Sequence, residues 1–565
     1  MAHFETYATK LWDILCKLRG KMTTTEYKNY ILPFMFYDFA SFQIEDLMKK
    51  ELANDIIMTA DGERPIKYIE AWNETDEDEV YTYRKDLIDL QMEQFGFVIE
   101  PKYMCAEILT KACMNNSTEY FVPIFEEAIE SFETRCSDNF KGTLNIIDLY
   151  NEALGESEAV ADQLLADLFR WTAQLCWSNY STNKDSNKDI LGDMYEELMG
   201  YFADASGTKG GEFYTPAEVS ELVAKLATFE VSNANAISDP TCGSGSLLIK
   251  VAEQLQASGG INGDLYGQEL NSLTHRLAKM NMCLHNVNAD NFHIDCCDTL
   301  SNNDNSAGKF FDITVANPPY SLDWDNGEYR LADNRFMGYG ALAPKGYADL
   351  AFLQHIVYHM TDKGHAAVLL PLGVLFRGNA EQTIRQALIS TYNVIDAIIA
   401  LPNNCFYGTG IPVCCIVLRK DRGQLNNICF IDATNEFIKV GKKNKLTDEN
   451  IEKIYSAFTD RQDIPHFCSI VDREIIKNND YNLNVPLYVE AEKVIEEHDI
   501  DKLFDEIGQL EVKTEALKKS INGQLEQFGI TKKFNVNESL ASQYVAPVEE
   551  PKAENVNSDA DDYDF

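Results

Sequence analysis

The sequence has no long apolar run, no CxxC cysteine pair and few basic residues, and each absence excludes a class of protein. No stretch of about 18 consecutive apolar residues occurs, which excludes a typical membrane-spanning helix. The first residues show no basic segment followed by an apolar one, so we expect no secretory signal. The 14 cysteines are irregularly spaced, which argues against a zinc site or a disulfide framework. We therefore expect a cytoplasmic protein without a metal or a membrane partner.

Basic residues are outnumbered: 49 Lys and Arg stand against 90 Asp and Glu, which gives a formal net charge of −41. A protein that binds DNA by itself usually has a basic surface, because lysine and arginine neutralise the phosphates. The charge therefore indicates a protein that does not bind DNA, or one that binds it with a basic partner. The chain also lacks a GxxxxGK[ST] phosphate loop, so we expect no ATP site.

The length of 565 residues exceeds what one core usually supports, so two or three domains are expected. Residues 1–165 show helical apolar patterns and predict an all-helical N-terminal domain. The next domain, residues 166–480, alternates short β-branched runs with helical stretches, which is typical of βαβ units and a mainly parallel sheet. The expected strands are residues 236–238, 265–267, 311–316, 366–370, 394–399, 413–418 and 428–431.

The C-terminal segment, residues 481–536, predicts a long helix with a heptad seam. The seam positions alternate by four and three residues and include two polar exceptions: Leu503, Ile507, Leu510, Thr514, Leu517, Ile521, Gln524 and Phe528. Such a seam packs against another helix, in a partner or on the same chain, and the pattern leaves both open. Residues 537–565 hold eight acidic residues and one lysine, which predicts a disordered acidic tail.

Two short motifs indicate a nucleotide-like cofactor site. Residues 239–245 read Asp-Pro-Thr-Cys-Gly-Ser-Gly, between an expected strand and an expected helix at 247–251. The glycines allow a tight turn close to a ligand at a helix N-terminus, although an ordinary structural turn has the same sequence features. Glu269 follows the next strand, 24 residues after Gly245, where an acid can accept hydrogen bonds from ribose hydroxyls. An acid in a solvated loop is the ordinary alternative.

The most specific motif is Asn317-Pro318-Pro319-Tyr320, directly after the expected strand 311–316. The two prolines make a rigid, extended backbone without N–H donors, so that carbonyl oxygens face outward. Asn317 adds a side-chain carbonyl, and Tyr320 adds a flat face on which a base can stack. These groups together suit an amine substrate. The alternative is a chance Pro-Pro turn, but its position at a strand end downstream of the other motifs argues against chance.

With these motifs in this order, the sequence resembles the amino-methyltransferases of DNA, and in particular the modification subunits of Type I restriction–modification systems. Residues 209–216 resemble the segment that covers S-adenosylmethionine in those enzymes, and residues 11–33 resemble their helical N-terminal domain. Segments 348–353, 370–377 and 406–412 are also similar to that family. The resemblance covers residues 10–490. It implies an α/β Rossmann-like S-adenosylmethionine-dependent methyltransferase domain and an all-helical N-terminal domain. The C-terminal helical segment, residues 481–536, follows them, and its heptad seam is our candidate for docking a partner.

The resemblance also implies roles residue by residue, with residues 317–320 as the catalytic loop. The implied cofactor-binding residues come from the covering segment, the glycine loop and the ends of two later strands: Gly211, Glu212, Phe213, Tyr214, Thr215, Pro216, Ala217, Asp239, Thr241, Cys242, Gly243, Ser244, Gly245, Glu269 and Asp298. Other members often have Ala or Gly at the position of Cys242, and the side chain here is still small. No metal ligand is implied.

The implied reaction moves the methyl group of S-adenosylmethionine to N6 of adenine in double-stranded DNA, which protects host DNA from restriction. The target adenine must leave the duplex, and Tyr320 would stack on it. The Asn317 side-chain oxygen and the Pro318 carbonyl oxygen would accept hydrogen bonds from its amine, so that positioning and charge placement carry the catalysis. The chain has no Pro-Cys dipeptide, the setting of the nucleophile in C5-cytosine methylation. Asn317 in place of serine favours adenine over cytosine N4.

The implied partners are double-stranded DNA and a separate specificity subunit, with two modification subunits for each specificity subunit. Such a partner would supply the basic surface that this acidic chain lacks. The sequence leaves open whether a restriction subunit joins the complex. The alternative functions are methylation of a protein glutamine, of an RNA amine or of cytosine N4 in DNA, and a cofactor-binding scaffold without activity. The intact glycine and Asn-Pro-Pro-Tyr motifs argue against the scaffold.

Overall fold

The computed structural model describes residues 24–59, 62–73, 80–114, 119–182, 198, 200, 214–302, 304–406, 410–441, 443–490, 500–531 and 533. The chain forms two compact units, residues 1–491 and 492–565. Within these described ranges, no helix is both long enough and apolar enough to cross a membrane. The predicted tail at 537–565 lies outside the described residues.

The N-terminal region is mainly helical, as the sequence predicts, but it is not all helical, because it also contains an antiparallel strand pair. Its central helix is α2, which is buried at every position from Tyr30 to Phe42. A helix that is apolar on all sides must be covered on all sides, and the other helices provide that cover. The helices are α2 (Thr24–Glu51), α3 (Tyr68–Asn73), α4 (Val80–Phe95), α5 (Cys105–Ile108), α6 (Phe121–Thr134) and α7 (Glu158–Thr182), and the strands are β1 (Ile56–Thr59) and β2 (Gly62–Pro65).

A nine-stranded sheet forms the centre of the following region, in the order β13-β10-β8-β9-β7-β6-β3-β4-β5. Strands β5, β4, β3, β6 and β7 are parallel, and β9 is antiparallel to both of its neighbours, β7 and β8. The strands are β3 (Asn233–Asp239), β4 (Ile261–Glu269), β5 (Phe292–Cys296), β6 (Phe311–Ala316), β7 (Met360–Pro371), β8 (Ile395–Ala400), β9 (Val413–Arg419), β10 (Asn427–Asp432) and β13 (Cys468–Asp472). A small hairpin, β11 (Ile438–Val440) and β12 (Lys443–Lys445), follows β10.

Each of the seven expected strands lies on one of these strands, and the mainly parallel α/β fold is confirmed. The two edge strands, β5 and β13, were missed because they are short and contain polar residues. Alternate side chains of β7 point to opposite faces: Ala367 and Leu369 join one hydrophobic core, and Val368 and Leu370 join the other.

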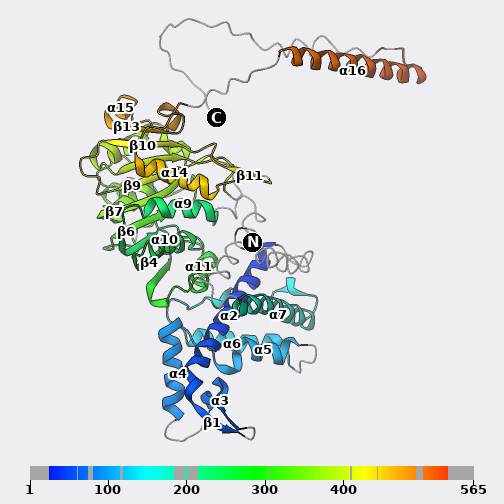
Figure 1. The fold of residues 1–565 in the computed structure, drawn as a ribbon, viewed down its shortest axis with the longest axis vertical. Helices are drawn as coiled ribbons and strands as arrows, with labels where there is room; N and C mark the ends of the chain where they lie inside the picture. Colours follow the sequence, from blue (N-terminus) through cyan, green and yellow to red (C-terminus); the bar gives the residue numbers. More distant parts are fainter. Residues whose placement is uncertain are drawn as a thin grey trace. The chain divides into compact units, whose positions relative to one another are not determined.

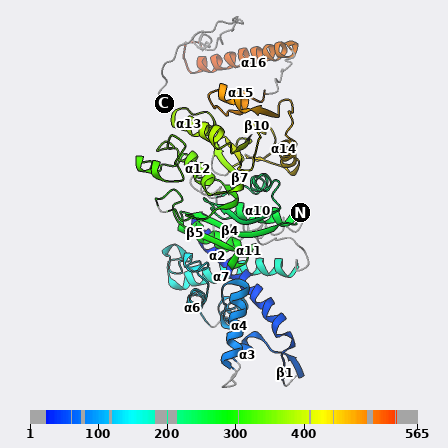
Figure 2. The same ribbon diagram turned by 90° about the vertical axis from the view of Figure 1, so that its left-hand side faces the viewer.

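Helices cover both faces of the sheet (Figures 1 and 2). One face packs against α9 (Ala217–Ala227), α10 (Ser246–Ala257), α11 (Ser272–Leu284) and α14 (Asp448–Asp460). The opposite face packs against α12 (Asp349–His359), α13 (Asn379–Gln386) and the short α15 (Arg473–Asn478). The result is the three-layer arrangement of a doubly wound α/β fold.

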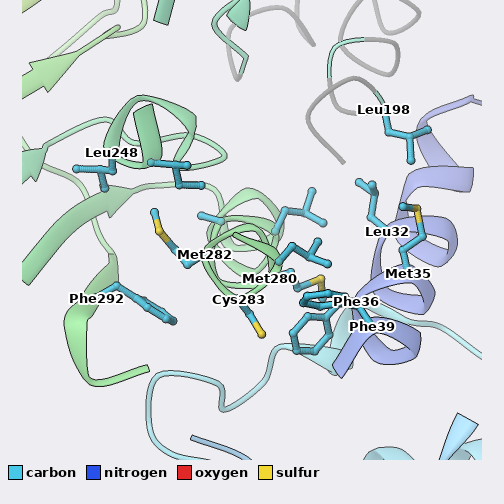
Figure 3. Packing of buried hydrophobic residues seen from close by; sticks show 14 of the residues in the cluster. Leu32, Met35, Phe36, Phe39, Leu198, Leu248, Met280, Met282, Cys283 and Phe292 are labelled. Carbon is cyan, nitrogen blue, oxygen red and sulfur yellow. The ribbon is translucent and has the colours of Figure 1, made fainter. Parts of the chain in front are cut away.

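The N-terminal region and the sheet region share one hydrophobic core, because α2 packs directly against α11. In Figure 3, Phe36 and Phe39 of α2 and Met280 and Cys283 of α11 point toward one another. The predicted boundary between residues 165 and 166 falls within α7, and the domain limits stay a prediction.

The second unit contains the helix α16 (Ile500–Gln527), where the sequence predicts a long helix. The apolar side chains along it, among them Leu503, Ile507, Leu510 and Leu517, are exposed. The partner of this seam stays a prediction.

Candidate active site

Most of the predicted site residues that the structure describes lie at the carboxyl ends of the central parallel strands. After β3 the chain passes through α10, β4, α11 and β5 and then returns to the other side of β3 as β6. The strand order thus reverses between β3 and β6, which is where α/β sheets bind ligands. The glycine loop follows β3, and the Asn-Pro-Pro-Tyr loop follows β6, so the two motifs flank this point.

The glycine loop is held by its own acid and by the next strand. Asp239, the last residue of β3, accepts a hydrogen bond from the backbone N–H of Thr241 (2.9 Å) through Oδ1. The N–H of Cys242 donates to the carbonyl of Gln268 in β4 (2.9 Å). Gly245 has a positive φ of 81°, and a Cβ there would overlap Met282 of α11. Glycine is favoured at this turn because other residues rarely adopt such a φ.

Glu269 closes the same loop from β4. Its Oε2 accepts from the backbone N–H of Gly243 (3.1 Å), and its Oε1 accepts from the N–H of Asn271 (2.7 Å). The side chain is buried, and burial raises its pKa although these backbone donors oppose the shift. Each carboxylate oxygen has a second lone pair, so Glu269 can still accept from ligand hydroxyls.

The segment before α9 reaches the catalytic loop. The Asn317 side-chain amide donates to Thr215 Oγ1 (3.0 Å), across 102 residues of sequence. Tyr214, Thr215 and Pro216 are buried, whereas Ala217 begins α9 and is exposed. The predicted contributions of residues 211–213 lie outside the described residues. The covering segment and the catalytic loop therefore meet at Thr215.

Within the catalytic loop, the Tyr320 hydroxyl donates to Asn317 Oδ1 (2.8 Å). The oxygen that is predicted to accept from the amine substrate thus accepts a hydrogen bond from Tyr320 in this structure. Burial raises the pKa of the Tyr320 hydroxyl well above its ordinary value, so it stays a proton donor. The ring lies edge-on to Phe406 (centroids 6.4 Å apart). Tyr320 therefore orients Asn317, and its use as a stacking face stays a prediction.

A small pocket joins the two loops. Its lining comes from the covering segment, the glycine loop, the first turn of α10 and the catalytic loop: Tyr214, Thr215, Cys242, Gly243, Ser244, Ser246, Leu247 and Asn317. Six of these eight residues were predicted from the sequence. Ser246 and Leu247 were missed as site residues, although they directly follow the glycine motif.

Asp298 lies at the margin of this group. It follows β5, whose end is joined to β4 because the N–H of Cys297 donates to the carbonyl of Glu269 (3.0 Å). The Asp298 side chain is exposed and accepts from the N–H of Leu300 (3.0 Å). It is near the end of β4, and in this structure its carboxylate closes a turn. Its contact with the cofactor stays a prediction.

Sequence reasoning also missed Asn281 of α11. This fully buried side chain donates to the carbonyl of Ser244 (3.0 Å) and so ties the glycine loop to the helix that packs against α2. An asparagine within an amphipathic helix gives no local sign of such a role.

Among the described residues, Asp304, His355 and His359 form one group whose potential metal-binding atoms all lie within 4.8 Å of one another. His359 Nε2 contacts Asp304 (2.9 Å), and its Nδ1 contacts the carbonyl of Lys309 (2.9 Å). The buried guanidinium of Arg335 lies 3.5 Å from His355 Nδ1. This fixed positive charge opposes cation binding, and we interpret the group as a polar network that supports the loop after β5.

Comparison with known proteins identifies the family of this chain. The family model described as N-6 DNA Methylase matches residues 186–497, and that of the HsdM N-terminal domain matches residues 7–171. The chain belongs to the N-6 DNA methylase family. The catalytic and glycine loops both lie within the matched methylase region.

Relatives of this N-6 DNA methylase are methylase subunits of Type I restriction enzymes. The MpnII methylase subunit of Mycoplasma pneumoniae is 34% identical over 530 residues, 91% of this chain and 94% of the relative. The MjaVIII methylase subunit of Methanocaldococcus jannaschii is 38% identical over 366 residues, 62% of this chain and 60% of the relative. The crystal structure of a type I restriction-modification methyltransferase subunit from Streptococcus thermophilus is 32% identical, with a TM-score of 0.74, and covers 86% of this chain and 100% of that chain.

Proposed function

We propose that this protein is the modification subunit of a Type I restriction–modification complex and methylates N6 of adenine in double-stranded DNA with S-adenosylmethionine. The observation that carries the proposal is the hydrogen bond between Asn317 and Thr215, which joins the catalytic loop to the cofactor-covering segment. The substrate amine and the methyl donor would meet at this junction. Since its substrate is genomic DNA, we also propose a cytoplasmic location.

The acidic groups around the glycine loop suit S-adenosylmethionine. Glu269 offers lone pairs to the ribose hydroxyls, and Asp239 Oδ2 is buried without a hydrogen-bond partner among the described residues. A buried acceptor of this kind needs a donor, which the ammonium or a hydroxyl of the cofactor can provide. Burial raises the pKa of Asp239 to about 7. A bound donor would lower this pKa, because a hydrogen bond to the charged form favours that form.

The bound cofactor would supply an electrophilic methyl group, and the protein would orient the amine toward it. Asn317 Oδ1 and the Pro318 carbonyl would accept hydrogen bonds from the adenine amine. Tyr320 already donates to Asn317 Oδ1 and so fixes the direction of its lone pairs. Catalysis of this kind depends on positioning and needs no covalent enzyme intermediate.

The partner in this proposal is a specificity subunit, which two modification subunits would accompany. The net charge of −41 disfavours DNA binding by this chain alone, so a basic partner must read the sequence. We propose α16 as the docking helix, because its apolar seam is exposed.

The decisive variant is Asn317→Ala. We expect it to lower kcat for N6-methyladenine formation at least ~100-fold, since the amine loses its acceptor and Tyr320 its partner. The dissociation constant of S-adenosylmethionine should stay within about threefold of wild type, because the glycine loop and Glu269 are unchanged. Nucleoside mass spectrometry of DNA treated with the full-length protein and its specificity subunit measures the product.

The control is Asn478→Ala, an exposed asparagine on α15 that should leave transfer unchanged. Full transfer by Asn317→Ala with normal cofactor binding would refute the mechanism. N4-methylcytosine as the only product would correct the base, and methylated protein or RNA without methylated DNA would correct the substrate class.

A further inference from the structure

The backbone that leaves the catalytic loop is held by a buried acid from a different layer of the fold. Ser321 directly follows Tyr320 and has a positive φ of 52°, a conformation that residues other than glycine adopt rarely. Its backbone N–H donates to Asp349 Oδ1 (2.9 Å). The structure around this bond must stabilise the unusual turn, because the turn itself costs about 1 kcal/mol or more.

Asp349 is well placed to hold that turn. It is the first residue of α12, where the helix N-terminus favours a negative charge, and it is completely buried. The two segments also run together beyond this bond, because the N–H of Ala348 donates to the carbonyl of Leu322 (3.1 Å). The catalytic loop is therefore attached to α12 through both backbone and side chain.

Arg377 orients the second oxygen of the same carboxylate. Its guanidinium lies 3.5 Å from Asp349 Oδ2 and 2.9 Å from Oε1 of Glu381, which is also buried. It lies over the ring of Tyr347 at 4.2 Å from the centroid, and a Cβ at Gly373 would overlap it. Arg377 is thus fixed from several sides and is 25% exposed.

We propose that Asp349 is a positioning residue for methyl transfer, which holds the loop of residues 317–321 in its reactive conformation, and that Arg377 fixes the Asp349 carboxylate for this task. The inference rests on the proposed function, since it concerns the same reaction. Asp349 acts on the backbone after Tyr320 and lines neither the pocket nor the amine site. Its loss should therefore reduce turnover and spare cofactor binding.

The test compares Asp349→Ala with Asp349→Asn in the full-length protein with its specificity subunit, S-adenosylmethionine and target DNA. The alanine variant loses the acceptor for Ser321, and we expect kcat to fall ~10–100-fold, as for loss of a buried charge-assisted hydrogen bond. The asparagine variant keeps an oxygen acceptor and should recover to within about fivefold of wild type. The dissociation constant of S-adenosylmethionine should stay within about threefold in both variants.

A second variant and a control separate positioning from folding. Arg377 lies at the surface side of the network. For Arg377→Gln we therefore expect a smaller loss of kcat, about fivefold, again with unchanged cofactor affinity. Asp396→Asn is the matched control: this equally buried acid pairs with Arg422 and Arg461 at the amino end of β8. It should lower the unfolding midpoint and leave kcat unchanged well below that midpoint.

The outcomes are separable from those of the proposed function. If the wild-type complex forms no N6-methyladenine, the proposed function fails before any variant is compared. If the wild type is active and Asp349→Ala or Arg377→Gln has the wild-type kcat, this inference alone fails. It also fails if cofactor affinity and kcat fall together, or if asparagine at 349 gives no recovery, because a structural role alone would do the same.

Discussion

Two long helices of this N-6 DNA methylase differ in the burial of their apolar side chains, which are buried in one and exposed in the other. In α2, all positions from Tyr30 to Phe42 are buried, including the polar Asp38 and Ser41. In α16, apolar residues such as Leu510 and Leu517 are 62% and 63% exposed. Both helices are 28 residues long, so length does not explain the difference.

The two helices differ in whether the chain itself provides the surface that covers their apolar side chains. Helix α2 is covered by helices of its own region and by α11, which also carries the Asn281 bond to the glycine loop. Its burial therefore supports both the fold and the cofactor site. Helix α16 exposes the seam that a second helix would cover, which is the basis for its proposed role in docking the specificity subunit.

The largest expected effect concerns the core of α2. Phe36 is fully buried and packs its ring against Phe97, Phe132 and Phe140. Phe36→Ala should lower the free energy of unfolding by about 3–5 kcal/mol, because it removes a buried ring and leaves a cavity. Chemical denaturation of the isolated chain measures this.

The matched variant is Phe504→Ala in α16, where the side chain is 67% exposed. It should change the free energy of unfolding by less than about 0.5 kcal/mol. Equal losses in the two variants would show that α16 is buried within the chain in solution, and the contrast between the helices would disappear.

The second effect concerns association and not stability. The double variant Leu510→Asp, Leu517→Asp places charges on the α16 seam, and we expect at least ~100-fold weaker binding of the specificity subunit. The isolated chain should keep its unfolding midpoint. Binding can be followed by calorimetry or by size-exclusion chromatography with light scattering.

Val512→Asp is the control, because Val512 is 71% exposed on the same helix but lies off the seam. It should retain near wild-type binding. Undiminished binding by the double variant would refute docking through α16, and an equal loss with Val512→Asp would show that the seam has no special role.

The sequence could predict features that a local pattern carries, and it could not predict contacts between distant residues. Strands such as 311–316 and the long helix at 500–527 were recognisable because their apolar patterns are local and regular. The glycine loop and the Asn-Pro-Pro-Tyr loop were recognisable because a short run of special residues carries each. The bonds Asn317–Thr215, Asn281–Ser244 and Ser321–Asp349 were not, because they join residues 102, 37 and 28 positions apart. Such contacts depend on how layers pack, and no local pattern encodes that.

The smallest expected effect is a pH dependence that should belong to α2 and be absent from α16. Asp38 of α2 is fully buried, with its oxygens accepting from Thr172 Oγ1 (2.8 Å) and from the Cys105 thiol (3.1 Å). Burial raises the pKa of Asp38 well above its ordinary value, although both hydrogen bonds oppose the shift. The folded chain therefore binds this proton more tightly than the unfolded chain.

The pKa of Asp38 in the folded chain lies above its value of about 3.9 in the unfolded chain. The tighter proton binding by the folded chain therefore contributes fully to the free energy of unfolding below about pH 4, and this contribution is lost as the pH rises toward the folded pKa. Asp38→Asn removes the titrating group, so its free energy of unfolding should fall less between pH 5 and pH 8 than that of wild type. Asp505→Asn, at an exposed position of α16, should reproduce the wild-type difference between the two pH values. If Asp38→Asn and Asp505→Asn behave alike, the buried acid of α2 does not titrate with folding, and the two helices differ only in their apolar contacts.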